Sequence, residues 1–83
     1  MTYFVYMLIT ISKNKKKTYV GYTNNLTQRL KKHNSNKGAK STRGYKWKVI
    51  FIKKFYKKNN AMSYEYKLKK DRKKRLTIVE KSK

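Results

Sequence analysis

The chain has 83 residues, which is enough for one small domain with a modest hydrophobic core. It contains no cysteine, and this excludes disulfides, thiolate zinc sites and a cysteine nucleophile. Its 25 Lys and Arg residues against three Asp and Glu give a formal charge of +22, which favours a polyanionic partner, most obviously nucleic acid.

The first eleven residues are rich in apolar side chains but do not resemble a targeting segment. They lack a basic start and a small-residue cleavage site, and they fall far short of the roughly 20 apolar residues that a membrane span needs. We therefore expect a soluble intracellular protein without a membrane partner, located in the cytoplasm or nucleoid, or in a nucleus.

A β-hairpin is predicted at the start of the chain. Residues 3–10 are dense in aromatic and β-branched side chains and predict one strand, and residues 17–22 predict a second. With the turn centred near residues 12 and 13, Tyr6 and Tyr19 are expected to lie opposite each other. Cross-strand partners share a face of the sheet, so these two phenols should point the same way.

A helix follows the hairpin, capped by one of residues 23–25 and ending near residue 34. Two leucines four residues apart can face the sheet. Arg29 and His33 have the same spacing and lie on a neighbouring stripe of the helix. The pattern thus places a cation and an imidazole side by side.

The middle of the chain holds a polar loop and a third strand. Residues 35–46 contain two glycines and many polar side chains and are expected to form a loop. Residues 47–55 predict a strand that is apolar on both faces in its middle. Such a pattern is typical of a strand inside a sheet, so we expect this strand to be internal.

A second helix is predicted from residue 59 or 60, and it carries Glu65. The basic tail, about residues 70–83, has room for a short final helix around Leu76. No repeat or linker divides the chain. The pattern predicts one α+β domain over residues 1–83, with a small, mostly antiparallel three-stranded sheet flanked by helices.

This order of hairpin, Arg-His helix, strand and glutamate helix resembles the GIY-YIG nuclease superfamily, in particular its small stand-alone members. The two named motifs would be residues 4–6 and 19–21, and the resemblance covers about residues 3–76. Phe4 replaces the glycine of the first motif. The asparagine that larger members carry after the glutamate helix falls here near Thr77.

The resemblance implies a Mg²⁺- or Mn²⁺-dependent endonuclease that hydrolyses DNA, selects structure rather than sequence, and serves repair, recombination or processing. It implies that Glu65 holds the metal, Tyr6 takes a proton from the attacking water, and Tyr19 hydrogen-bonds a phosphate oxygen. The choice between the two tyrosines as base stays open. Arg29 would neutralise charge at the phosphorus, and His33 would orient water or donate to a phosphate oxygen or the leaving group.

Each of these residues also has an ordinary structural interpretation. Glu65 can form a surface pair with Lys69, and strand tyrosines usually pack against a sheet. Arg29 can be a solvated helical side chain, and His33 can be favoured at a helix C-terminus by the macrodipole. Asp71 would lie about 120° from Glu65 around a continued helix, so a single carboxylate is expected at the metal.

Basic side chains outside this set are candidates for contacts with the nucleic-acid backbone, although charge runs are usually solvated faces and an AT-rich genome also enriches lysine. The basic run can also serve as a nuclear localisation signal. Rival functions are a non-catalytic DNA- or RNA-binding module and an inactive accessory subunit; a homodimer or a protein partner also stays open. The candidate backbone contacts are Lys32, Lys37, Lys40, Arg43, Lys69 and Arg72.

Overall fold

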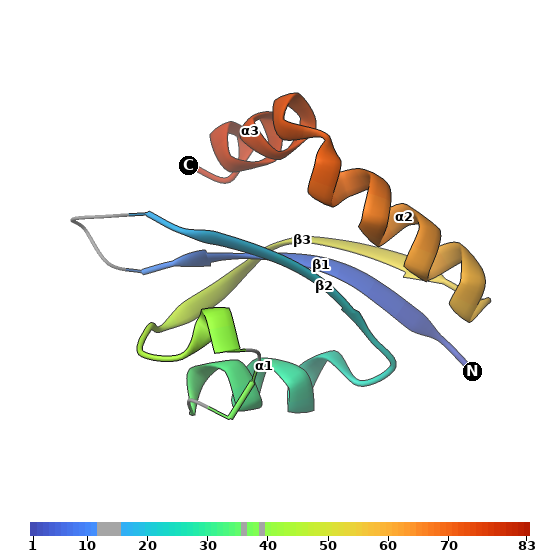
Figure 1. Ribbon diagram of the computed structural model, residues 1–83, viewed down its shortest axis with the longest axis horizontal. Helices are drawn as coiled ribbons and strands as arrows, with labels where there is room; N and C mark the ends of the chain where they lie inside the picture. Colours follow the sequence, from blue (N-terminus) through green and yellow to red (C-terminus); the bar gives the residue numbers. More distant parts are fainter. Residues whose placement is uncertain (12–15, 36, 39) are drawn as a thin grey trace.

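The computed structural model describes residues 1–11, 16–35, 37, 38 and 40–83. A three-stranded antiparallel sheet has the order β2-β1-β3, with β1 at Tyr3–Thr10, β2 at Thr18–Thr23 and β3 at Trp47–Phe55. Helices cover both of its faces (Figure 1). The predicted α+β class with a three-stranded sheet is confirmed.

The prediction that residues 47–55 form the internal strand is wrong. β1 lies in the centre and pairs with both neighbours, and its residues 5–10 are all buried. β3 is an edge strand in which residues 52–54 are exposed. Its two lysines at 53 and 54 are typical of a strand edge that faces solvent, because charged side chains discourage pairing with another chain.

The register of the hairpin also differs from the prediction. Tyr6 pairs with Gly21, and Tyr19 pairs with Leu8, so the expected Tyr6–Tyr19 pair is wrong by two positions. The turn proposed near residues 12 and 13 lies outside the described residues. Because a slip of two residues keeps every side chain on its own face, both tyrosines still point the same way.

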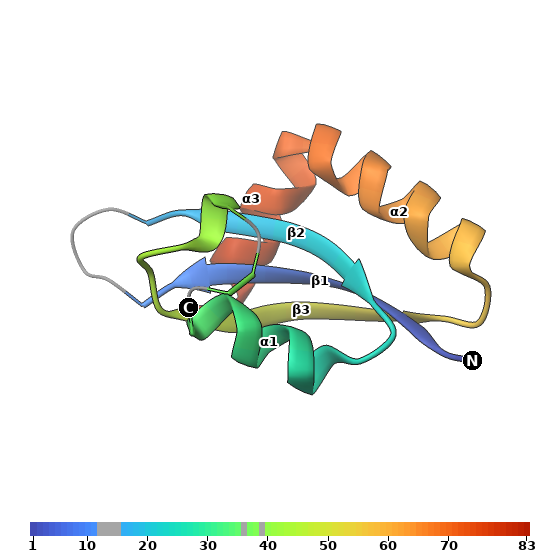
Figure 2. The ribbon, with the colours of Figure 1, turned by 60° about the horizontal axis from the view of Figure 1, so that its bottom comes forward.

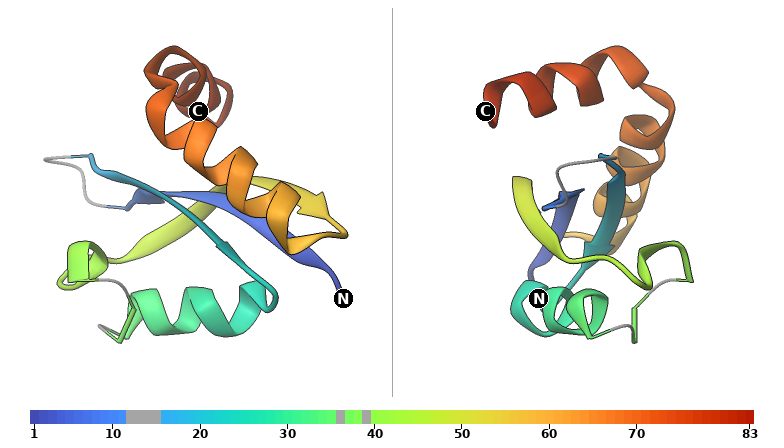
Figure 3. Two further views of the ribbon diagram at one scale, coloured as in Figure 1. Left: turned by 45° about the vertical axis from the view of Figure 1, so that its right-hand side comes forward. Right: turned by 90° about the vertical axis from the view of Figure 1, so that its left-hand side faces the viewer.

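Two helical layers enclose the sheet. α1 (Leu26–Asn34) and the short 3₁₀ helix η1 (Lys40–Thr42) lie on one face, and α2 (Lys58–Lys70) and α3 (Arg72–Lys81) lie on the other (Figures 1 and 2). The side views in Figure 3 show the same two layers on either side of the twisted strands. Among the described residues, no helix has the length and apolar character needed to cross a membrane.

Side-chain caps set the helix boundaries. The side chain of Asn25 accepts a hydrogen bond from the Gln28 amide at 3.1 Å, which resolves the three predicted cap positions to one. Asp71 ends α2 and caps α3 by accepting from the Lys74 amide at 3.0 Å. The helix that carries Glu65 therefore does not continue through Asp71, contrary to the geometry assumed above.

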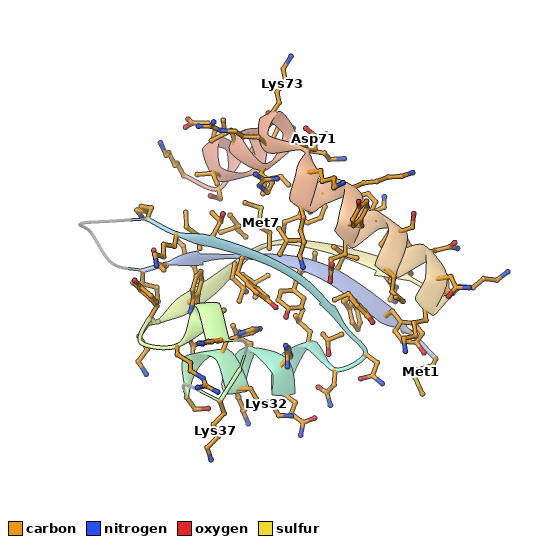
Figure 4. The ribbon with its side chains drawn as sticks, viewed as in Figure 1. Met1, Met7, Lys32, Lys37, Asp71 and Lys73 are labelled. Atoms are coloured by element: carbon orange, nitrogen blue, oxygen red, sulfur yellow. The ribbon has the colours of Figure 1, made fainter. Side chains whose placement is uncertain are left out.

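Alternation along β1 divides the core into two clusters. The cluster under α2 and α3 is apolar, and Figure 4 shows Met7 pointing to that side. The cluster on the α1 side contains two large aromatic side chains with polar atoms. The buried members of the first are Val5, Met7, Val20, Ala61, Leu68 and Ile78, and those of the second are Tyr6, Leu8 and Trp47.

Candidate active site

Tyr6 lies in the middle of β1 and is 1% exposed on the α1 face. Gly21 is its partner on β2. A Cβ atom at Gly21 would lie 2.6 Å from the Tyr6 hydroxyl oxygen and 2.9 Å from Cε2 of Tyr19. Glycine is needed at this position because the phenol ring of Tyr6 packs directly against the backbone of β2 there.

The hydroxyl of Tyr6 begins a buried chain of polar groups. It lies 2.9 Å from Nε2 of His33, and Nδ1 of His33 lies 2.9 Å from Oγ1 of Thr42. The indole N–H of Trp47 donates to the carbonyl oxygen of Thr42 at 2.9 Å. His33 is fully buried with both ring nitrogens engaged, so the geometry does not support its predicted contact with a phosphate or leaving group.

Residues at the end of α1 and just after it hold His33 in place. The side-chain amide of Asn34 accepts from the Trp47 backbone N–H at 2.6 Å and donates to the Trp47 carbonyl at 3.2 Å, which ties α1 to the start of β3. A Cβ atom at Gly38 would lie 2.6 Å from Nδ1 of His33. Sequence reasoning missed Thr42 and Asn34, and a glycine soon after the histidine was the one available signal.

Arg29 precedes His33 by one helical turn and reaches the same group of polar side chains. Its guanidinium hydrogen-bonds the phenols of Tyr6 and Tyr19, and these contacts, with Tyr6 first, raise the pKa of Arg29. The ring of Tyr19 lies 6.3 Å from that of Tyr6 and 4.9 Å from that of His33, centre to centre. The structure therefore brings the two tyrosines, the arginine and the histidine together.

Burial keeps two titratable side chains of this cluster, Tyr6 and His33, in their neutral forms. It raises the pKa of Tyr6 to about 12, against an opposing hydrogen bond from Arg29, and the charges of Tyr19 and Glu65 act in the same direction as burial. Burial and, next, the charge of Arg29 lower the pKa of His33. At neutral pH, Tyr6 therefore keeps its proton and His33 stays uncharged.

Glu65 approaches from α2, on the opposite side of the sheet from α1. Its side chain is 16% exposed, and Oε1 lies 3.2 Å from Nζ of Lys69, which is the surface pair considered above. Its charge contributes to the raised pKa of Tyr6, so the field of the carboxylate reaches the phenol.

The donor set suits one particular class of metal ion. Within the described ranges, no three His, Asp or Glu side chains gather as a metal cluster. A single carboxylate such as Glu65 fits Mg²⁺, which retains several waters and accepts the remaining ligands from substrate phosphates.

The basic candidates lie on both sides of the sheet. Figure 4 shows Lys32 and Lys37 pointing outward from the α1 side, whereas Lys73 lies beyond α2 and α3. Sheet and core separate the two groups. The candidates on or after α1 are Lys32, Lys37, Lys40 and Arg43, and those on α2 and α3 are Lys69 and Arg72.

Known proteins are similar to this chain in sequence and in fold. A family model described as the GIY-YIG catalytic domain matches residues 2–77. The chain belongs to the GIY-YIG family. GIY-YIG domains mark a nuclease superfamily, and its members generally use divalent metals.

Relatives of this GIY-YIG protein include several UPF0213 proteins. The chain is 52% identical to UPF0213 protein OB0043 of Oceanobacillus iheyensis over 52 residues, which is 61% of this chain and 60% of that protein's length. It is 40% identical to UPF0213 protein RBAM_000440 of Bacillus velezensis over 95% of this chain and 79% of that protein. The solution NMR structure of UPF0213 protein BH0048 from Bacillus halodurans matches with a TM-score of 0.50 and 34% identity, over 96% of this chain and 84% of that one.

Proposed function

We propose that this protein is a metal-dependent endonuclease that hydrolyses phosphodiester bonds in DNA. The clustering of Tyr6, Tyr19, Arg29 and His33 between the sheet and α1, where the charge of Glu65 also acts on Tyr6, is the observation that supports it most. A neutral proton carrier, a phosphate-binding cation and a metal-binding carboxylate are the groups that phosphodiester hydrolysis needs. We take residues 1–83 as one nuclease domain.

Tyr6 and His33 form the proposed proton path. Because the pKa of Tyr6 is raised to about 12, the phenol has no negative charge to offer at neutral pH. Its oxygen takes a proton from the attacking water while its own proton moves 2.9 Å away to Nε2 of His33. The water thus loses one proton and the imidazole gains one. Thr42 accepts the Nδ1–H bond that keeps the imidazole in the receptive tautomer.

Arg29 and Tyr19 bind the phosphate in this scheme. The planar guanidinium can donate two parallel hydrogen bonds to phosphate oxygens and opposes the charge that develops at the phosphorus. The Tyr19 phenol, which is half-buried beside Arg29, donates a further hydrogen bond. For His33 we thus propose the role of proton acceptor behind Tyr6, in place of orienting water or donating to a phosphate oxygen or the leaving group.

Glu65 would hold Mg²⁺ or Mn²⁺. When bound, such an ion supplies positive charge to the phosphate and lowers the pKa of a coordinated water. Glu65 is the acidic side chain coupled to the cluster, because Asp71 caps α3 and Glu80 pairs with Lys83 at 3.1 Å.

The proposed substrate follows from charge. With a formal charge of +22, the protein should bind DNA through its phosphates, and binding should weaken steeply as salt concentration rises. Contacts to phosphates carry no sequence information, so we propose selection by DNA structure and a role in repair, recombination or processing.

A cleavage assay tests the proposal. Pure protein is incubated with labelled duplex, flap, junction and single-stranded DNA, with and without Mg²⁺. We expect metal-dependent product from wild type and, for Glu65→Gln, a loss of roughly a thousandfold in rate with nearly unchanged binding. The matched control is Glu80→Gln, which also removes an acidic partner of a lysine and should cleave normally.

Three outcomes contradict the proposal. Product that persists in EDTA would exclude the metal requirement. Parallel loss of cleavage and binding in Glu65→Gln would show that the carboxylate supports the fold or the DNA contact instead. No product from any substrate would favour the non-catalytic binding module.

A further inference from the structure

A hollow at the free edge of β2 adjoins the proposed active site. It has a volume of about 370 Å³ and is lined by Thr18, Tyr19 and Val20 of β2 and by Lys69 and Arg75. Tyr19 also belongs to the proposed active site, so the two share one residue of β2. We call this hollow the edge subsite.

A second, smaller hollow extends the edge subsite along the same strand. Its volume is about 190 Å³, and it shares Thr18 and Arg75 with the edge subsite. Arg72 also lines it, above an apolar base of Met7 and Val79. Cations of α2 and α3 therefore follow the edge of β2 over both hollows.

Arg75 is held firmly at this place. One guanidinium nitrogen donates to the carbonyl oxygen of Leu68 at 2.9 Å and also to that of Lys69, at the last turn of α2. The Leu68 carbonyl also accepts from the Asp71 amide at 3.2 Å, so the arginine adds a second donor at the end of α2 and takes a defined orientation. Arg75 also lines the edge subsite.

The edge of β2 adds backbone donors. The Thr10 amide donates to the Lys17 carbonyl at 3.0 Å, and residues alternate along an antiparallel ladder between inward and outward hydrogen bonding. This alternation directs the N–H and C=O groups of Thr18 and Val20 outward, toward the edge subsite. The two outward amides and the two cations can all donate to an anion.

Lys69 connects the edge subsite to the metal position. Its ammonium lies 3.2 Å from Oε1 of Glu65, and its side chain is 49% exposed. Positive charge on a metal at Glu65 would repel this ammonium and release it. The lysine can then turn into the hollow that its own side chain lines.

We propose that the edge subsite binds the DNA phosphate that neighbours the scissile phosphate, with Lys69 and Arg75 as its cationic walls. When metal and DNA bind, the Lys69 ammonium leaves Glu65 and contacts this phosphate instead. This proposal rests on the proposed nuclease function. It makes a flanking phosphate part of substrate recognition, so the protein should cut within a strand.

The test uses DNA in which one phosphate at a time is replaced by an uncharged methylphosphonate. In wild type, replacement at one position beside the cut should slow cleavage by roughly five- to tenfold, as expected for one charge-assisted contact. In Lys69→Gln the same replacement should have less than about twofold effect, because the contact is already lost. Lys67→Gln, on the same helix but outside the edge subsite, should retain the full effect.

A second measurement does not depend on cleavage. In a Glu65→Gln background with EDTA, DNA binding is titrated with salt. Lys69→Gln should lower the slope of log K against log salt by about one, and Lys67→Gln should leave it unchanged. Full methylphosphonate sensitivity in Lys69→Gln, or an unchanged slope, would overturn the edge subsite. Absence of any wild-type product would overturn the nuclease proposal instead, and the salt slope would still decide the edge subsite.

Discussion

The two faces of the sheet are built from alternate residues of one strand and yet do different work. Val5 and Met7 of β1 point to α2 and α3, where every buried side chain of the cluster is apolar. Tyr6 and Leu8 point to α1, where the phenol meets the buried histidine and threonine. One face therefore provides stability through apolar burial, and the other places polar groups for chemistry.

The α1 face can hold buried polar groups because each has a partner. Among the described residues, no buried side-chain nitrogen or oxygen lacks a hydrogen bond. Removing one member of such a network leaves the other unsatisfied at a cost of about 1–3 kcal/mol. Substitutions in the polar network of the α1 face should thus affect chemistry and stability together, whereas those in the apolar cluster under α2 and α3 should affect stability alone.

The largest expected effect on stability comes from Leu68→Ala on the apolar face. Leu68 is 2% exposed, and its truncation should lower the free energy of unfolding by about 2–4 kcal/mol, through lost burial and the cavity that remains. Urea denaturation measures the change. The cleavage rate per folded molecule should stay at the wild-type value, and a reduced rate would contradict the division between the faces.

Gly21→Ala should damage the α1 face by steric conflict with the Tyr6 hydroxyl, which lies 2.6 Å from the Cβ position. We expect a loss of about 1–3 kcal/mol in stability and a reduced cleavage rate. The double variant with Tyr6→Phe provides the check, because removing the hydroxyl removes the closest clash. Strictly additive losses in the double variant would show that the two residues are not coupled.

Tyr6→Phe alone should remove the proton carrier and leave Nε2 of His33 without its partner. Cleavage should fall by roughly a hundredfold or more, and the free energy of unfolding by about 1–2 kcal/mol. An alkaline rise in the pH–rate profile of wild type should disappear. Tyr22→Phe is the matched control, since Tyr22 packs on the apolar face, and unchanged cleavage in Tyr6→Phe would move the base elsewhere.

The smallest effect should be a loss of stability in mild acid. Burial lowers the pKa of His33 in the folded protein, so the unfolded chain binds the proton more readily. The stability due to neutral His33 is complete above its unfolded pKa of about 6.5 and is lost as pH falls below that value. Because His33 is the only histidine, His33→Gln should flatten this part of the curve, and a wild-type curve already flat between about pH 7 and 5 would contradict the burial of a neutral imidazole.

Local patterns in the sequence determined the elements and their faces. Alternation along the first two strands sent Tyr6 and Tyr19 to one face, Asn25 was among the expected caps, and the spacing of Arg29 and His33 placed both on one side of α1. The scarcity of acidic residues directed attention to Glu65. Each of these inferences depends on residues that are close together in the chain, where helix and strand geometry is known in advance.

Only the tertiary structure decided how these elements meet. The pairing of Tyr6 with Gly21, the central place of β1 and the burial of His33 against Thr42 and Gly38 each depend on contacts between separate segments. The loops that connect the segments allow several registers and orientations, and packing of the whole core selects one. The role that we propose for His33 differs from the expected one for this reason, because its sequence position shows a helix face but not what covers it.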